Sequence, residues 1–447
     1  MTPRCAAHAA RRTQLLERMQ PGAVAVLGTA PEVLRNGDSD YPYRHDSHFY
    51  YLTGFAEPES FAVLVAAQGE RPARTILFCR EKNVEREIWE GFRFGPEAAR
   101  DAFGFDEAWP IDELDARMTD ILADAPALYY ALGHGAELDA RVAGWLKAVR
   151  ARGRTGVTAP QTMHHLLAML DEMRLLKNEH EIALMARAGV ISAQAHARAM
   201  RAARPGMFEY EIEAELLHEF RRNGAQFPAY PSIVASGPQA CVLHYNANDR
   251  CIADGDLVLI DAGCELDGYA SDITRTWPAN GRFSDAQRTL YELVLRAQSA
   301  AIAAVVPGRP YSAIHDAAVR VLTEGMLDLG LLDRNKAGTL DEAIATRAYT
   351  QFYMHGTGHW LGMDVHDVGA YRDVASPDKP SRPLLPGMAL TVEPGIYVRP
   401  GEGVPERFWN IGIRIEDDVV VTDAGCRILT AGAPKEVADI EELMRKL

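Results

Sequence analysis

The apolar residues of this chain come in short runs that alternate with amphipathic, helix-like stretches. Runs of this kind are typical of buried strands, and the alternation predicts an α/β (α+β) fold. The longest run covers 61–67, far short of the roughly 20 residues that a membrane-spanning helix needs. In the first third of the chain we predict strands at 23–27, 61–67, 75–79 and 127–132, with helices at 111–123 and through Trp145.

The chain has 447 residues, which is too long for one ordinary hydrophobic core and indicates two domains. We predict an N-terminal α/β domain over 1–150, a connection with a short helix over 151–176, and a second domain over 177–447. Asn178 and Glu181 have the spacing of a capping box, as do Ser284 and Gln287, so each pair should begin a helix.

The net charge of −15 argues against nucleic acid or an anionic membrane as a partner, because both require a basic surface. Six cysteines are scattered without a CxxC pair, and the first residues lack the apolar segment of a secretory signal. Both features are typical of a cytoplasmic protein with reduced thiols.

Carboxylates stand at the ends of predicted strands in the second domain. A strand at 257–260 leads directly to Asp261, and a turn through Gly268 returns a strand carrying Asp272. This separation suits a hairpin that brings the two carboxylates face to face, although a loop aspartate and an edge aspartate would give the same pattern. Glu393 ends another strand, immediately before Pro394.

The segment 411–421 alternates as a strand should. Ile411, Ile413 and Ile415 point to one face, and Gly412, Arg414 and Glu416 point to the other. The second face indicates a functional surface, with an exposed, salt-bridged edge as the alternative.

Three histidines lie close together in "HGTGHWLGMDVHDVG", residues 355–369. His355 and His359 have the spacing of a helical zinc protease site, but glycine occupies the position of the required glutamate. The acidic ligands of a metal site here must then come from strands elsewhere in the chain. Two aspartates, two glutamates and a histidine suit Mn²⁺, Co²⁺ or Zn²⁺, and the charge of four carboxylates predicts two such ions.

The strings "LIDAG", "SDITRT", "HGTGHWLGMDVHD", "TVEPG" and "GIRIED" resemble the metallopeptidases of the pita-bread fold. That group includes methionine aminopeptidase, prolidase and aminopeptidase P. Upstream, "PYRHDSHFYYLTGF" (42–55) and "EIWEG" (87–91) resemble the N-terminal domain of bacterial aminopeptidase P, which methionine aminopeptidases lack. The resemblance covers residues 20 to 440. It implies an N-terminal α/β domain followed by a C-terminal pita-bread (creatinase/methionine aminopeptidase-like) catalytic domain.

The resemblance also implies roles for particular residues. Two divalent ions, with Mn²⁺ expected first and Co²⁺ or Zn²⁺ as alternatives, would be bound by Asp261, Asp272, His359, Glu393 and Glu416. The expected catalytic residues are Glu393, which would carry the proton of the attacking water, together with His366, His244 and Arg414. The expected substrate-binding residues are His244, His366, His355, Tyr397 and Trp89.

The residues alone leave three of these roles open. His244 could be a histidine satisfied by its surroundings, His355 a loop histidine, and Trp89 a packing residue. The resemblance instead suggests that Trp89 reaches the active site of a neighbouring subunit.

The implied activity is hydrolysis of the bond between an N-terminal residue and a following proline, including in peptides longer than two residues. A prolidase, which acts on dipeptides only, is the alternative. A creatinase-type amidinohydrolase or a binding protein with a decayed site is disfavoured, because all five ligands are present. The resemblance further implies a homodimer or homotetramer, and peptides are its only expected partners besides its own copies.

Overall fold

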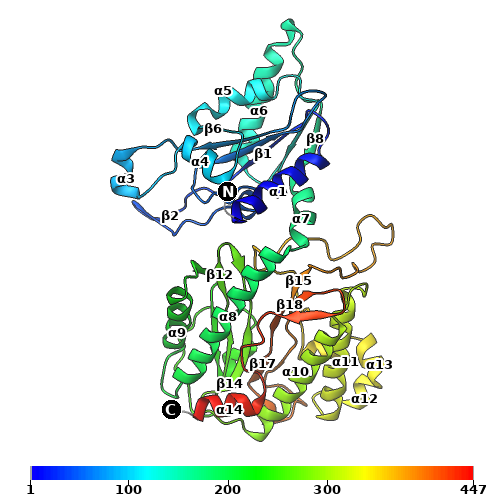
Figure 1. Ribbon diagram of the computed structural model, residues 1–447. Coiled ribbons are helices and arrows are strands. Elements are labelled where there is room, and N and C mark those ends of the chain that lie inside the picture. Colours follow the sequence, from blue (N-terminus) through cyan, green and yellow to red (C-terminus); the bar gives the residue numbers. More distant parts are fainter. Residues whose placement is uncertain (1–2, 446–447) are drawn as a thin grey trace. The chain divides into compact units, whose positions relative to one another are not determined.

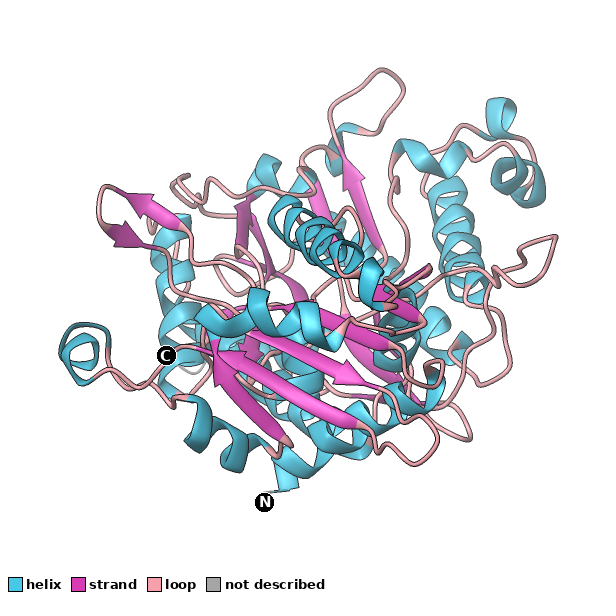
Figure 2. Ribbon diagram, turned by 90° about the horizontal axis from the view of Figure 1, so that it is seen from above, coloured by secondary structure: helices cyan, strands magenta, loops and turns pink. Residues whose placement is uncertain are grey.

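The computed structural model describes residues 3–445 of the chain. The chain divides into two compact units, Met1–Met173 and Arg174–Leu447. Helices and strands are interspersed through both units (Figures 1 and 2), so the predicted mixed α/β architecture is confirmed. No helix within residues 3–445 combines the length and the apolar character that a membrane crossing requires.

The first unit is built on a six-stranded mixed sheet. Its central strand β1 pairs antiparallel with β4 and parallel with β7. Val24, Val26 and Val63 pack in one core with Trp145 of α6, which explains why the predicted strands read as continuous apolar runs. In spatial order the strands are β6 (Glu107–Pro110), β5 (Arg74–Cys79), β4 (Phe61–Val65), β1 (Val24–Gly28), β7 (Ala127–Tyr130) and β8 (Thr162–His165).

Helices and one small hairpin complete this unit. The helices are α1 (Pro3–Arg18), α2 (Ser47–Thr53), α3 (Val84–Glu90), α4 (Pro96–Phe103), α5 (Leu114–Ile121), α6 (Ala136–Ala151) and α7 (Leu166–Leu175), and the hairpin is β2 (Leu34–Asn36) with β3 (Ser39–Asp40). The sequence suggested a connection over 151–176, but β8 lies inside this segment and pairs in parallel with β7. The first unit therefore continues to Met173.

The second unit begins with the long helix α8 (Glu179–Ala202), which packs against α9 (Glu209–Arg222). Asn178 and Glu181 form the predicted capping box of α8, and Ser284 and Gln287 form that of α10. Figure 1 shows α10 beside α11 in the yellow-green part of the chain. The remaining helices of the unit are α10 (Asp285–Ala304), α11 (Ser312–Asp328), α12 (Arg334–Ala337), α13 (Leu340–Ala345) and α14 (Val437–Arg445).

The sheets of the second unit contain two antiparallel strand pairs that are each interrupted midway. In the first pair β11 runs against β14, and the chain between them forms the hairpin β12–β13. In the second pair β15 and β16 run against β18 and β17. The strands are β9 (Phe227–Pro228), β10 (Ile233–Ser236), β11 (Leu257–Asp261), β12 (Cys264–Leu266), β13 (Tyr269–Ala270), β14 (Thr274–Pro278), β15 (Ala389–Val392), β16 (Gly395–Val398), β17 (Ile411–Arg414), β18 (Asp417–Val421) and β19 (Cys426–Ile428).

The interruption of the first pair depends on Gly263. A Cβ atom at this position would lie 1.8 Å from the carbonyl oxygen of Ser271, so only glycine lets the two backbones approach this closely. The hairpin predicted at this place is present, but Asp272 lies in the break before β14 rather than within a strand.

The predicted strand 411–421 also breaks, since β17 ends at Arg414 and β18 begins at Asp417. The predicted alternation nevertheless holds. Ile411, Ile413 and Ile415 belong to the main hydrophobic core, whereas Arg414 and Glu416 line a cavity.

Candidate metal centre and active site

The four carboxylates selected from the sequence all lie at the strand interruptions. Asp261 is the last residue of β11, Asp272 precedes β14, Glu393 separates β15 from β16, and Glu416 separates β17 from β18. All four line one cavity of about 420 Å³.

Hydrogen bonds join the two strand pairs at this point. The backbone N–H of Glu416 donates to the carbonyl oxygen of Thr274 at 3.0 Å, and Thr274 Oγ1 donates to Glu416 Oε2 at 2.6 Å. Asp272 and Glu416 therefore face the same space although they come from distant parts of the chain.

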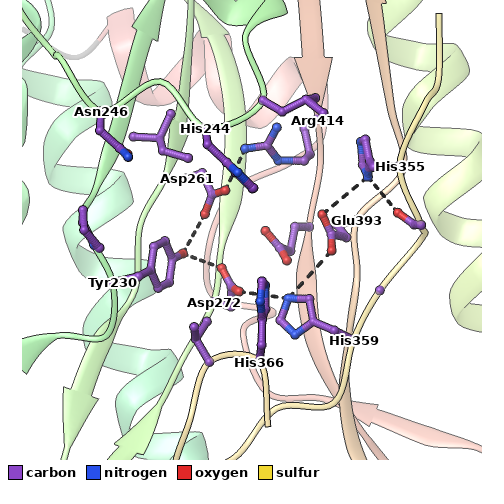
Figure 3. Close-up of a pocket in the computed structure, with 17 residues that line it drawn as sticks. Tyr230, His244, Asn246, Asp261, Asp272, His355, His359, His366, Glu393 and Arg414 are labelled. Carbon is purple, nitrogen blue, oxygen red and sulfur yellow. Dashed lines mark hydrogen bonds and ion pairs between the residues drawn. The ribbon is translucent and has the colours of Figure 1, made fainter. Parts of the chain in front are cut away.

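His359 approaches the carboxylates from an irregular loop that pairs with β15. Its carbonyl oxygen accepts from the backbone N–H of Thr391 at 2.9 Å. Its Nδ1 lies 3.0 Å from the carbonyl oxygen of Trp360, which places the proton on Nδ1 and leaves Nε2 free for a ligand. Figure 3 shows the ring between Asp272 and Glu393, with Nε2 3.4 Å from Asp272 Oδ2 and 3.8 Å from Glu393 Oε1.

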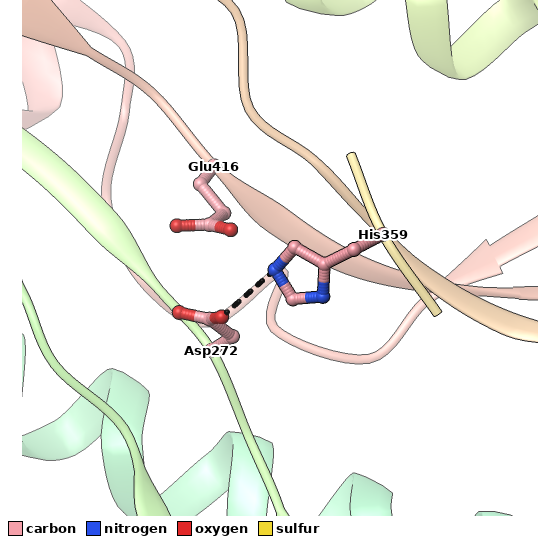
Figure 4. A group of neighbouring side chains, drawn as sticks. All are labelled: Asp272, His359 and Glu416. Atoms are coloured by element: carbon pink, nitrogen blue, oxygen red, sulfur yellow. Dashed lines mark ion pairs between the residues drawn. The ribbon is translucent and has the colours of Figure 1, made fainter. Parts of the chain in front are cut away.

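Asp272, His359 and Glu416 form a group that could hold a metal ion (Figure 4). One potential ligand atom from each residue lies within 4.8 Å of the others. Burial, together with the neighbouring carboxylates of Asp272, Glu393 and Asp261, raises the pKa of Glu416 well above its ordinary value. Burial opposes protonation of His359, but the hydrogen bond and charge of Asp272 outweigh it and raise the pKa to about 9. Both shifts favour the protonated form, which shows that the group of Asp272, His359 and Glu416 attracts positive charge.

The donor set fits divalent ions. Burial raises the pKa of Asp261 and raises that of Glu393 to about 7, so the ionised carboxylates need cations beside them. Arg414 provides one, with Nη2 2.7 Å from Asp261 Oδ2. Four carboxylates and one guanidinium leave three negative charges. Oxygen ligands with one imidazole suit hard or borderline divalent ions.

Arg414 also donates from Nη1 to the hydroxyl of Tyr397 at 3.0 Å. The sequence resemblance assigned Tyr397 to substrate binding, but the residue is only 1% exposed and does not line the described cavity. Its hydroxyl instead supports Arg414 and His355 from behind, with the oxygen 2.8 Å from His355 Nε2.

The other three histidines selected from the sequence all line the cavity. The ring of His366 packs edge-on against His359, with the centroids 4.2 Å apart. His355 Nδ1 lies 2.7 Å from the carbonyl oxygen of Gly356, so both ring nitrogens of His355 are engaged. Burial and the charge of Arg414 lower the pKa of His355 to about 3, and the ring is neutral. His244, from the segment between β10 and β11, lines the same cavity (Figure 3).

Sequence reasoning did not find Tyr230. Its hydroxyl lies 2.7 Å from Asp261 Oδ1 and is also hydrogen-bonded to Asp272 (Figure 3). Tyr230 precedes β10, whose Ile233 pairs with Asp261. No local pattern marks Tyr230, and only this strand pairing could have predicted its position.

Trp89 belongs to α3 in the first unit, where it is 86% exposed. The interpretation as a packing residue within its own unit is therefore wrong.

Residues 183–423 match the model of metallopeptidase family M24. The chain belongs to this family. Residues 8–129 match the N-terminal domain of aminopeptidase P, so both halves of the predicted resemblance are confirmed for this family M24 protein.

Relatives of this M24 chain match it over most of their own length. The Xaa-Pro aminopeptidase of Escherichia coli is 46% identical, over 97% of this chain and 96% of its own. The human Xaa-Pro aminopeptidase 3 is 36% identical, over 98% of this chain and 85% of its own.

Solved structures show the same fold. An aminopeptidase from Pseudomonas aeruginosa, PepP, superposes with a TM-score of 0.95 at 49% identity, covering 99% of this chain and 98% of that one. A zinc-substituted aminopeptidase P from E. coli in complex with product has a TM-score of 0.94 at 46% identity, with the same coverage. The predicted N-terminal α/β domain and pita-bread catalytic domain are thereby confirmed.

Proposed function

We propose that this M24 protein is a metal-dependent aminopeptidase that hydrolyses the bond between an N-terminal residue and a following proline, including in peptides longer than two residues. The observation that carries the proposal is the group of Asp272, His359 and Glu416 in an open cavity. It occurs in a chain that is 46% identical to an Xaa-Pro aminopeptidase over nearly all its length. The same likeness disfavours a prolidase.

The proposed ligands are Asp261, Asp272, His359, Glu393 and Glu416, holding two divalent ions, with Mn²⁺ as the first candidate. Two such ions supply four positive charges against the three net negative charges of the carboxylates and Arg414. When bound, the ions polarise the scissile carbonyl and lower the pKa of the attacking water. Asp261 and Asp272 are both held by the hydroxyl of Tyr230, which would fix their separation.

The remaining residues of the cavity would bind and orient the peptide. The N-terminal ammonium group would lie against the carboxylates, which attract a cation. The bond before proline is a tertiary amide without an N–H group. Recognition therefore needs groups that donate a hydrogen bond to the carbonyl oxygen, and a pocket for the proline ring. We assign these contacts to His366 and His244, with the neutral His355 as a further wall of the cavity.

Two side chains would act on charge during the reaction. Glu393 lines the cavity, with Oε1 3.8 Å from His359 Nε2, and it would carry the proton from water to the departing proline nitrogen. Arg414 would hold Asp261 in place through their 2.7 Å ion pair and keep a positive charge beside the developing oxyanion.

We also propose a homodimer or homotetramer in which Trp89 contacts a neighbouring subunit. Large apolar side chains gather on α3 and just after it, where Val84, Ile88, Trp89 and Phe92 are 70%, 77%, 86% and 65% exposed. An exposed apolar group of this kind is typical of an interaction surface. A cytoplasmic location is supported by the six cysteines, all of which are free.

A panel of four peptides tests the proposed activity. Ala-Pro-Ala should be cleaved rapidly, acetyl-Ala-Pro-Ala and Ala-Ala-Ala little or not at all, and the dipeptide Ala-Pro more slowly than the tripeptide. Each rate is measured by chromatography as the loss of the intact peptide, because cleavage of the acetylated peptide would release acetylalanine rather than free alanine. A strong preference for the dipeptide would instead identify a prolidase.

A further inference from the structure

The loop that carries His366 is anchored by a group of four charged side chains outside the cavity. Arg174 Nη2 lies 2.8 Å from Asp364 Oδ2 and 2.7 Å from Asp367 Oδ1, and Lys177 Nζ lies 2.8 Å from Asp367 Oδ2. The charges of the two cations and two anions balance, which offsets the cost of burying three of the four side chains, while the Asp364 side chain is 37% exposed. The side chains of Arg174, Lys177 and Asp367 are each 1% exposed.

His366 itself has little to hold it. Its side chain faces the cavity, and it makes no hydrogen bond with any residue in the described range 3–445; its ring contact is with His359. Its position must therefore come from the backbone on either side. The next residue, Asp367, points away from the cavity into the charged group, and its backbone N–H donates to the carbonyl oxygen of Trp360 at 2.9 Å.

The other end of the anchor is fixed to the core. The backbone N–H of Lys177 donates to the carbonyl oxygen of Gly387 at 2.9 Å, just before β15. Leu175, between the two cations in sequence, is fully buried against Trp360 and the apolar residues of β15. The cations therefore cannot follow the loop if it shifts.

The backbone at Gly362 packs closely against the Asp367 carboxylate and the Lys177 side chain. A Cβ atom at Gly362 would lie 2.2 Å from Asp367 Oδ2 and 2.9 Å from Cε of Lys177. Only glycine at this position lets the loop close over the carboxylate.

We propose that Asp367, held between Arg174 and Lys177, is a positioning residue that fixes His366 against the substrate. The inference rests on the proposed function, in which His366 contacts the peptide. A displacement of about 1 Å at a contact that acts in the transition state can lower the rate about 100-fold. The loss should therefore fall mainly on kcat.

The main test is a double-mutant cycle with Asp367→Asn, His366→Ala and the combined variant. We measure kcat and KM on Ala-Pro-Ala, metal content by elemental analysis, and unfolding by circular dichroism. Asp367→Asn should lower kcat about 10- to 100-fold with unchanged metal content. In the His366→Ala background the same substitution should change kcat by no more than about twofold, because its effect passes through His366.

A second pair of variants covers the case in which Asp367→Asn does not fold. Lys177→Met and Asp364→Asn each remove one charge from the same group, and both leave the pair of Arg174 and Asp367 intact. The Lys177 side chain pairs with the Asp367 carboxylate, whereas the Asp364 side chain pairs with Arg174, so Lys177→Met should lower kcat and Asp364→Asn should not. Equal effects of these two variants would overturn the proposal.

Other outcomes are equally decisive. Loss of bound metal in Asp367→Asn, or losses that multiply fully in the combined variant, would show that Asp367 does not act through His366. A fully active His366→Ala would overturn both this inference and the role proposed for His366. Inactivation by a chelator would still uphold the metallopeptidase assignment in that case.

Discussion

Replacing Gly263 by alanine should separate the two chain segments that carry Asp261 and Asp272. The added methyl carbon would lie 1.8 Å from the carbonyl oxygen of Ser271 and 2.5 Å from its carbonyl carbon. An ordinary contact of this kind needs about 3.5 Å, so the backbones must move apart by about 1.7 Å. Both sides of the contact are backbone, and no side-chain rotation can relieve it.

The expected cost follows from this geometry. Overpacking a core usually costs about 1–3 kcal/mol, and a clash between two backbones should reach the upper end of that range. Asp272 follows Ser271 directly, so its carboxylate should shift relative to Asp261 by about 1 Å, which can lower kcat/KM about 100-fold. The divalent ions that Asp261 and Asp272 would help to hold should be bound less tightly.

The assay combines guanidinium unfolding, metal analysis and kcat/KM on Ala-Pro-Ala. Gly425→Ala is the matched control, because a Cβ atom there meets no described atom within 4 Å; it should change stability by less than about 0.5 kcal/mol. If Gly263→Ala matched this control in stability, metal content and rate, the reasoning from the close approach would be refuted.

Three further predictions concern the site itself. A chelator should abolish activity and Mn²⁺ or Co²⁺ should restore it, with two equivalents bound per chain by elemental analysis; a single equivalent would contradict the charge argument. Glu416→Ala should lose both metal and activity while the fold persists, whereas His366→Ala should keep both ions and lose turnover. Loss of metal in His366→Ala with metal retained in Glu416→Ala would contradict these two assignments. In a rapid-mixing experiment, the cis fraction of Ala-Pro-Ala, about 10–30%, should be cleaved only at the isomerisation rate, over tens of seconds, and a prolyl isomerase should remove this slow phase.

The sequence determined the kinds of ligand and the faces on which they lie. Alternation at 411–416 put the isoleucines in the core and Arg414 and Glu416 in the cavity, as the structure has them. The capping pairs at Asn178 and Ser284 marked the beginnings of two helices. Such features depend on residues within a few positions of one another, where helix and strand periods and capping hydrogen bonds operate.

Only the tertiary structure decided which distant residues meet. The bond between Thr274 and Glu416 spans 142 residues, and the pair of Arg174 and Asp367 spans 193. Tyr230 reaches Asp261 and Asp272 through the pairing of β10 with β11, and the break that leaves Asp272 outside a strand follows from the close approach at Gly263. None of these contacts has a local sequence pattern, because each forms only after long segments have packed on a common core. The packing of that core, rather than any local spacing, fixes the distances between the contacting residues.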